Sequence, residues 1–210
     1  MPAMEATEGT SDRAARLTRF LPWALALLAI AAYANSFQGV FVFDDRDAIL
    51  HDPIVTGQKP LVDAVHSVRP AVTLSLALNH RLHGLHVVGY HVVNLAIHIA
   101  GGLLLYGLVA RLIRLRAMRS RRSDSPRLRS APGTLTAFVV AAIWLVHPLQ
   151  TQSVTYIIQR AEAMTGLCYL LMLYALLRAA EGDDGEGREV TSRRGTWIVL
   201  AVAACAVGMV

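Results

Sequence analysis

The hydrophobic positions of this chain fall in long blocks separated by polar and charged segments. A helix needs roughly 20 mainly apolar residues to cross the hydrocarbon core of a bilayer, which is about 30 Å thick. The blocks that meet or approach this length are 20–33, 87–113, 134–146, 164–177 and 197–210. No segment alternates with period two over the ten or so residues that a barrel strand needs. The pattern therefore predicts an all-α, polytopic helical membrane protein with about five transmembrane helices.

The polar segments between these blocks define the predicted organisation. We expect, in order, a tail (1–18), a first span (19–36), an outer loop (37–86), a second span (87–113), a basic loop (114–133), a third span (134–147), an outer turn (148–160), a fourth span (161–178), a linker (179–196) and the start of a fifth span (197–210). Within the outer loop, Ala71–Leu82 predicts a short amphipathic helix on or re-entering the outer leaflet. Because the last block has no charge or helix stop after Trp197, we expect a truncated chain.

Charge sets the predicted orientation. The chain is 54% hydrophobic and has a formal net charge of +5. Its arginines gather between the second and third spans, at positions 111, 114, 116, 119, 121, 122, 127 and 129. Basic residues in short loops mark the cytoplasmic side, so the outer loop lies on the opposite face. We expect an integral protein of the bacterial inner membrane with a periplasmic active face, and no nucleic-acid partner.

The first block has two interpretations. Arginines, an apolar stretch and Ala32-Tyr33-Ala34 before Asn35 are also typical of a secretory signal peptide with its cleavage site. We expect the block to be retained as a membrane anchor. Cleavage would leave the rest of the predicted topology unchanged.

An acidic pair, Asp44 and Asp45, follows the first span, with Asp47 and Asp52 close behind. A carboxylate here is a candidate general base that accepts the proton of an attacking hydroxyl, and a neighbouring like charge raises the pKa of such a group. Clustered carboxylates also suit a hard divalent cation, so a metal is possible although none is certain. The alternative is a solvated loop with helix-capping aspartates.

The second span carries a polar face. His91, Asn94 and His98 stand at i, i+3 and i+7, so they line one side of a helix. Polar side chains inside a span usually face a bundle interior or a cavity, but interhelical hydrogen bonding explains them equally well. We expect His147, at the outer turn, to support the same site. His80, His83 and His86 are not expected to bind zinc, because Gly84 interrupts them.

Two arginines are candidates for binding an anionic donor. Arg69 precedes the amphipathic helix, and its guanidinium suits a lipid phosphate, although it could equally reach toward lipid head groups with no specific role. Arg160 opens the fourth span beside Glu162, where a charge pair is costly unless it faces water or a protein interior. Arg160 would hold the donor phosphate, or the pair would only anchor the end of the helix.

Several short blocks, taken in order, resemble one family. They are Tyr33-Ala34-Asn35-Ser36-Phe37 leading into Phe41-Val42-Phe43-Asp44-Asp45, then Arg69-Pro70, Tyr90-His91-Val92-Val93-Asn94 with His98, Leu145-Val146-His147-Pro148, and Gln159-Arg160-Ala161-Glu162. Together they span residues 33–178 and are similar to the transmembrane and tetratricopeptide-repeat O-mannosyltransferase family. The resemblance also favours retention of the first span.

The resemblance implies a glycosyltransferase of the C-type superfamily, which uses polyprenyl-phosphate sugars on the outer side of a membrane. It implies a catalytic role for Asp44 or Asp45 and a place near the donor phosphate for Arg160. The further membrane helices and repeat domain that are usual in the family are missing from these residues. A Ser-Lys-Glu-like motif is expected after Gly208-Met209, where the sequence stops, and the Arg119–Gly133 insert is unusually long and basic.

We therefore expect an inverting transferase that moves a sugar, mannose by resemblance, from a polyprenyl-phosphate lipid to a protein or other hydroxyl acceptor, with membrane lipids around it. Activity of the complete protein would not imply activity of this fragment by itself. The alternative is a non-catalytic membrane module that binds lipid-linked sugar or scaffolds partner proteins. A transporter is a third hypothesis, for which no paired broken helices are visible in the sequence.

Overall fold

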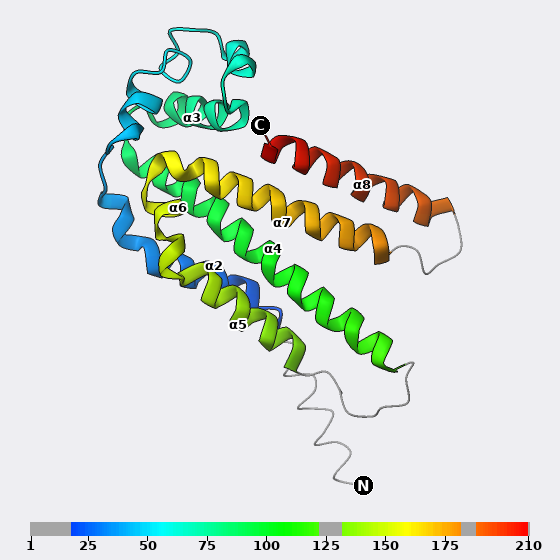
Figure 1. Cartoon of the computed structure of the whole chain (residues 1–210). Coiled ribbons are helices and arrows are strands. Elements are labelled where there is room, and N and C mark those ends of the chain that lie inside the picture. Colours follow the sequence, from blue (N-terminus) through cyan, green and yellow to red (C-terminus); the bar gives the residue numbers. More distant parts are fainter. Residues whose placement is uncertain (1–17, 122–131, 182–187, 210) are drawn as a thin grey trace.

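A computed structural model describes residues 18–121, 132–181 and 188–209, and these ranges contain helices and turns but no strand. The longest helix, α4 (Val87–Arg121), runs through the middle of the molecule (Figure 1). Helices α2 (Leu21–Tyr33) and α5 (Pro132–Val146) pack on one side of it, and α7 (Arg160–Glu181) packs on the other with α8 (Arg188–Met209) beside it. The predicted all-α membrane fold is confirmed.

Three helical stretches in the described ranges are long and apolar enough to cross a membrane: Leu21–Gln38, Val87–Met118 and Ile157–Glu181. A fourth candidate is a bent pair, Gly133–Val146 and Pro148–Thr155, whose two parts meet at 53°. A shorter apolar helix, Arg194–Met209, covers the predicted fifth span. The residues 21–33, 87–113, 134–146, 164–177 and 197–209 of the five predicted hydrophobic blocks are therefore helical.

Two helices extend into segments that were predicted as polar connections. Helix α4 continues past residue 113 to Arg121, since leucine, alanine, methionine and arginine all favour helix and neither glycine nor proline interrupts them after Gly107. Helix α8 likewise begins at Arg188, inside the predicted linker. The predicted tail as far as residue 17 and the middle of the basic loop, 122–131, lie outside the described residues.

The predicted outer loop forms a cap over one end of the bundle (Figure 1). It consists of η1 (Ala34–Gln38), a π-helical turn η2 (Arg46–Leu50), η3 (Leu61–His66) and α3 (Pro70–His83), which corresponds to the predicted amphipathic helix. Ile49 and Val55 of the loop pack with Leu76 of α3, Tyr90 of α4 and Ile157. This apolar cluster attaches the cap to the spans.

A second irregular connection joins α5 to α7. Helix α5 ends at Val146 because Pro148 supplies no backbone N–H and keeps His147 extended (ψ 134°). Three short turns follow: η4 (Pro148–Gln150), α6 (Thr151–Thr155) and η5 (Ile157–Gln159). Their carbonyl groups lie next to membrane-spanning helices and need hydrogen-bond donors from the protein.

Helices α4 and α5 approach closely at a glycine. A Cβ atom added at Gly102 would lie 2.5 Å from Cδ2 and 2.6 Å from Cγ of Leu145, which is fully buried. Small residues that allow such an approach are common where helices pack in membranes.

Replacing Gly102 with alanine should therefore lower the free energy of unfolding by about 1–3 kcal/mol, because the buried leucine has to move. The matched control is Gly166→Ala in α7, where an added Cβ meets nothing within 4 Å. Thermal unfolding of the purified protein in detergent would measure both variants. Equal midpoints for the two would contradict the close packing of α4 on α5.

Candidate functional site

Asp45 is a buried anchor between the two irregular connections. Its side chain is only 1% exposed. One carboxylate oxygen accepts a hydrogen bond from the backbone N–H of Val42 (3.1 Å), and the other accepts one from the N–H of Ile158 (2.8 Å). The second bond joins residues 113 positions apart in sequence. Asp45 therefore ties the start of the cap to the turn that leads into α7.

Asp44 has a different environment although it is the next residue. It is exposed, and its carboxylate forms no hydrogen bond or ion pair with any residue in the described part of the chain. Its backbone N–H donates to the hydroxyl of Tyr156 (3.2 Å). Phe43, just before it, is 84% exposed and has φ of 45°, a left-handed conformation that is rare outside glycine. The chain is thus held in a strained turn that presents a free carboxylate.

Burial also affects the ionisation of Asp45. Burial raises the pKa of Asp45 above its ordinary value, and the hydrogen bonds from Val42 and Ile158 lower it by a smaller amount. Burial favours the neutral acid, whereas donors to the carboxylate favour the ion. The described neighbours of the pair are not arranged as a metal site, since no three of the described His, Cys, Asp or Glu residues gather in that way.

Arg160 is fully buried at the first turn of α7 and connects three helices. Its guanidinium donates to Asn94 Oδ1 (2.7 Å), Asn79 Oδ1 (2.8 Å), the carbonyl oxygens of Tyr90 and Ser75 (3.2 Å each) and Ser75 Oγ (3.4 Å). These five hydrogen bonds equal the five N–H groups that a guanidinium has. The side chain therefore fastens α7 to α3 and α4.

All the acceptors around Arg160 are neutral. No carboxylate among the described residues pairs with it, and Glu162, two residues away, instead lies 3.6 Å from Arg69. Burying a cation is costly unless hydrogen bonds replace its hydration. Here amide, hydroxyl and carbonyl oxygens do so, which leaves none of the guanidinium's N–H groups free to reach a ligand.

The predicted polar face of α4 is buried and satisfies the backbone of the α5–α7 connection. Asn94 Nδ2 donates to the carbonyl oxygen of Ile157 (3.2 Å), and His98 Nε2 lies 2.9 Å from that of Leu145. His91 Nδ1 lies 3.4 Å from the carbonyl oxygen of Val154. Interhelical hydrogen bonding, one of the two interpretations of this face, thus describes its contacts.

His91 also explains a glycine in the cap. Its Nε2 atom is buried and has no hydrogen-bond partner within the described part of the chain, and a Cβ added at Gly39 would lie 2.8 Å from it. Gly39 thus permits the cap to approach α4 closely. His147, by contrast, is exposed, and its Nδ1 accepts a hydrogen bond from Leu149 N–H (3.2 Å), so it caps its own turn rather than joining the buried face.

Arg69 is the accessible basic residue near this end of α7. Its side chain is 55% exposed and forms a loose ion pair with Glu162, which is 60% exposed. Both line a cavity of about 260 Å³ together with Val72 and Thr165, and the end of α8 closes it at 207–209. Arg69 thus has the exposed position that a phosphate-binding residue requires, and Arg160 does not.

A second cavity, of about 360 Å³, lies between α4, α5 and α7. Its apolar part includes Ile97, Trp144 and Leu170, while Gln150 and Ser153 line its polar part. Glu162 lines both this cavity and the one beside Arg69. The first turn of α7 therefore lies between the two cavities.

Comparison with known proteins places the sequence among named relatives. The chain is 29% identical over 218 residues to the Drosophila melanogaster protein O-mannosyl-transferase Tmtc3, which covers 95% of the chain and 23% of that protein. It is 29% identical over 198 residues to human protein O-mannosyl-transferase TMTC4, covering 87% of the chain and 26% of the relative. It is 33% identical over 159 residues to Drosophila Tmtc1, covering 69% of the chain and 16% of the relative. The chain belongs to the TMTC O-mannosyltransferase family.

The family resemblance inferred from the short blocks is thereby confirmed. The chain spans about a quarter or less of the length of these relatives. No family profile matches it, and no solved structure matches it significantly.

The site of this TMTC-family chain also contains residues that were not predicted from the sequence. Ser75 and Asn79 of α3 accept hydrogen bonds from Arg160, and the hydroxyl of Tyr156 accepts one from the backbone N–H of Asp44. Ser75 and Asn79 stand at i and i+4, so their shared face of the amphipathic helix was a usable signal. No signal in the sequence pointed to Tyr156, because its partner Asp44 lies 112 positions away.

Replacing Arg160 with methionine or lysine should lower the free energy of unfolding by about 3 kcal/mol or more, because several buried oxygens lose their donors. The control is Arg69→Met, where only an exposed ion pair of up to about 1 kcal/mol is lost. Unfolding midpoints of the purified variants would test this. A lysine variant as stable as the parent would contradict the five-bond arrangement.

The raised pKa of Asp45 predicts a pH dependence with a definite sign. The native state binds this proton more tightly than the unfolded state, whose pKa is about 4. Stability due to Asp45 should therefore fall as the pH rises through the interval between the unfolded and folded values.

Asn at position 45 cannot titrate, so the difference in unfolding midpoint between the parent and Asp45→Asn should shrink as the pH rises above about 4. Asp44→Asn is the control, since its carboxylate is exposed. A difference that stays constant or grows with pH would contradict the assignment.

Proposed function

We propose that this chain contributes the catalytic acidic pair and part of the donor site of a protein O-mannosyltransferase. The reaction moves mannose from a polyprenyl-phosphate lipid to a hydroxyl group of a protein on the outer side of the membrane. The names of the relatives support the mannosyl transfer to protein. The observation that carries the proposal is the pairing of a free, exposed Asp44 with a buried anchor, Asp45.

Asp44 serves as the general base. Its carboxylate oxygens are accessible and unpaired in the described structure, so they can accept a hydrogen bond from an acceptor hydroxyl. Asp45 has both oxygens committed to backbone N–H groups and is a positioning residue. A base is effective only when it is held within hydrogen-bond reach of the proton that it removes. Two hydrogen bonds hold Asp44 in position: the Ile158 N–H donates to the carboxylate of Asp45, and the Asp44 N–H donates to the hydroxyl of Tyr156.

Arg69 binds the leaving phosphate group. As the hydroxyl oxygen attacks the anomeric carbon from the opposite face, the bond from that carbon to the phosphate oxygen breaks and negative charge develops on the polyprenyl phosphate. A guanidinium is well shaped to bind this charge. Arg69 is exposed and lines a cavity, and its partner Glu162 is held only at 3.6 Å, so a phosphate can replace Glu162.

The lipid portion of the donor has a suitable path. The 260 Å³ cavity that Arg69 lines also has apolar walls at Val72, Met164 and Val207. An isoprenoid chain next to the phosphate would lie along the apolar walls. Inversion at the anomeric carbon follows from this single displacement, in which the acceptor proton goes to Asp44.

Asp44→Asn in the native polypeptide should lower mannosyl transfer by about 10²–10⁴-fold, because the general base is lost. The unfolding midpoint should stay unchanged, because the substitution removes no hydrogen bond or ion pair of the described structure. Asp45→Asn should lower both activity and stability. Asp47→Asn is the matched control, since that exposed carboxylate pairs with His51 (2.9 Å).

Transfer would be measured with radiolabelled mannose on a serine- or threonine-containing acceptor protein. Full activity of Asp44→Asn would contradict its role as base. Polyprenyl-phosphate mannose should support transfer, whereas GDP-mannose alone with purified protein should not. Transfer from GDP-mannose would overturn the donor assignment and leave the base assignment intact.

The second candidate is a non-catalytic module that binds lipid-linked sugar. The extensive structural use of Arg160, His91, Asn94 and His98 favours it, since each of these side chains has backbone or amide partners. It predicts that Asp44 and Asp45 can be replaced without loss of function, whereas the polar face of His91, Asn94 and His98 still matters for folding. Transfer activity that depends on Asp44 would exclude it.

A further inference from the structure

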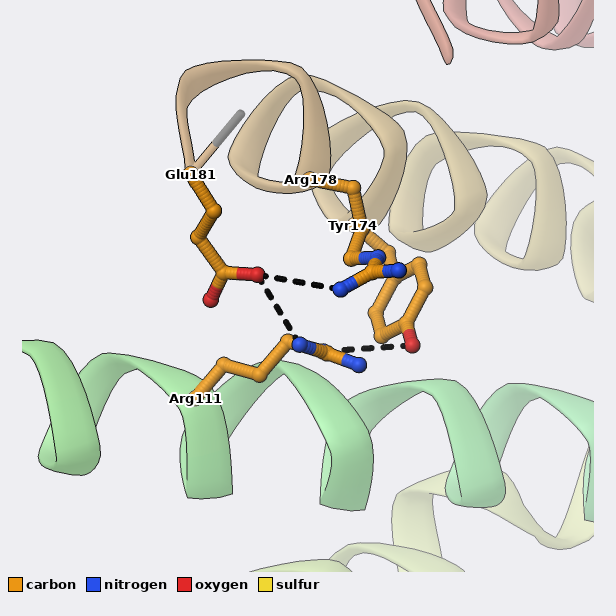
Figure 2. A network of polar contacts seen from close by, with 4 residues as sticks. All are labelled: Arg111, Tyr174, Arg178 and Glu181. Atoms are coloured by element: carbon orange, nitrogen blue, oxygen red, sulfur yellow. Dashed lines mark hydrogen bonds and ion pairs between the residues drawn. The ribbon is translucent and has the colours of Figure 1, made fainter. Parts of the chain in front are cut away.

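A second polar cluster lies about 30 Å along α4 from His91, at the arginine-rich end of the helix, since helical residues rise 1.5 Å each. Arg111 of α4 and Arg178 of α7 both donate to one carboxylate oxygen of Glu181, at 2.9 and 3.3 Å (Figure 2). Arg111 Nε also donates to the hydroxyl of Tyr174 (3.2 Å). Two cations thus share one anion, and the cluster keeps an excess positive charge.

The hydrogen bonding of this cluster is incomplete. Arg178 Nε and Glu181 Oε1 are buried and have no hydrogen-bond partner among the described residues. Polar atoms in such positions are usually paired with protein or with a bound molecule. The aromatic rings around the cluster fix its geometry: Arg111 lies over Tyr174 at 5.1 Å, and Arg178 lies over Trp197 at 5.1 Å.

Next to the cluster is a cavity of about 510 Å³ between α4, α5 and α7. Arg111, Arg114, Thr134 and Tyr174 form its polar part. The rest of the lining is small or apolar, and comprises Gly107, Ala110, Ile113, Ala117, Met118 and Gly133. Arg114 is exposed and has no ion-pair partner among the described residues, so its charge is available to a ligand.

We propose that this cavity binds the phosphate of an anionic phospholipid from the leaflet at this end of α4. The cavity lies at the end of the spanning stretch Val87–Met118, where lipid head groups meet the hydrocarbon. Arg114 and Arg111 bind the phosphate, and the wall at Gly107, Ala110 and Ile113 receives the beginning of an acyl chain. Basic pockets between membrane helices are suited to such head groups. The site is independent of the proposed transferase site at the other end.

A lipid that binds only the folded protein raises its apparent stability. The purified chain in a neutral detergent would be titrated with phosphatidylglycerol, phosphatidylcholine or inorganic phosphate, and its unfolding midpoint measured. Phosphatidylglycerol should raise the midpoint by several degrees, and the other two should have little effect. Equal shifts with phosphatidylcholine, or the full shift with inorganic phosphate, would overturn the proposal of an anionic lipid.

Two variants locate the effect. Arg114→Gln removes a charge that has no ion-pair partner in the described ranges, and it should abolish most of the shift caused by phosphatidylglycerol. Arg81 is an exposed arginine of α3 at the opposite end, so Arg81→Gln should keep the shift. Ala110→Leu fills the apolar wall without changing charge and should also abolish the shift while the midpoint without lipid is retained. An undiminished shift in Arg114→Gln and Ala110→Leu would place the lipid elsewhere and refute this site.

Discussion

The hydrogen bonds of the Arg160 guanidinium are the interaction on which the capped end of this bundle depends. This guanidinium lies at the point where α3, α4 and α7 meet and binds Asn79 of α3, Asn94 of α4 and the carbonyl oxygen of Tyr90. A buried cation has no stable alternative to these bonds, because the side chain is fully buried and no carboxylate among the described residues pairs with it. The three helices therefore have one mutual arrangement.

A second constraint concerns backbone carbonyl groups. The α5–α7 connection is irregular but lies against membrane helices, where an unpaired carbonyl is costly. The α4 side chains His91, Asn94 and His98 meet the carbonyls of Val154, Ile157 and Leu145. Polar residues in a span are therefore used here to allow a broken helix rather than to form a pathway. The same turn then supplies the N–H of Ile158 to Asp45.

These contacts divide the acidic pair into two roles. Asp45 has a structural role, since both of its carboxylate oxygens accept backbone hydrogen bonds. Asp44 lies beside it in a strained turn, and its carboxylate has no partner among the described residues. The division extends to the arginines, since Arg160 has its N–H groups engaged while Arg69 stands exposed at a cavity. The proposed chemistry thus uses the exposed member of each pair, and the buried member holds it in position.

Much of this protein follows from the order of its residues. Long apolar blocks require helices, because a helix satisfies its own backbone in lipid, and the i, i+3, i+7 spacing places His91, Asn94 and His98 on one face. The short blocks around Asp44, Tyr90 and Arg160 identify the family. Only the tertiary structure decided which aspartate is buried and which arginine is engaged, since the partners Ile158 and Asn79 lie 113 and 81 positions away. Adjacent residues of one type look alike in a sequence, and burial, which depends on distant segments, gives them different chemistry.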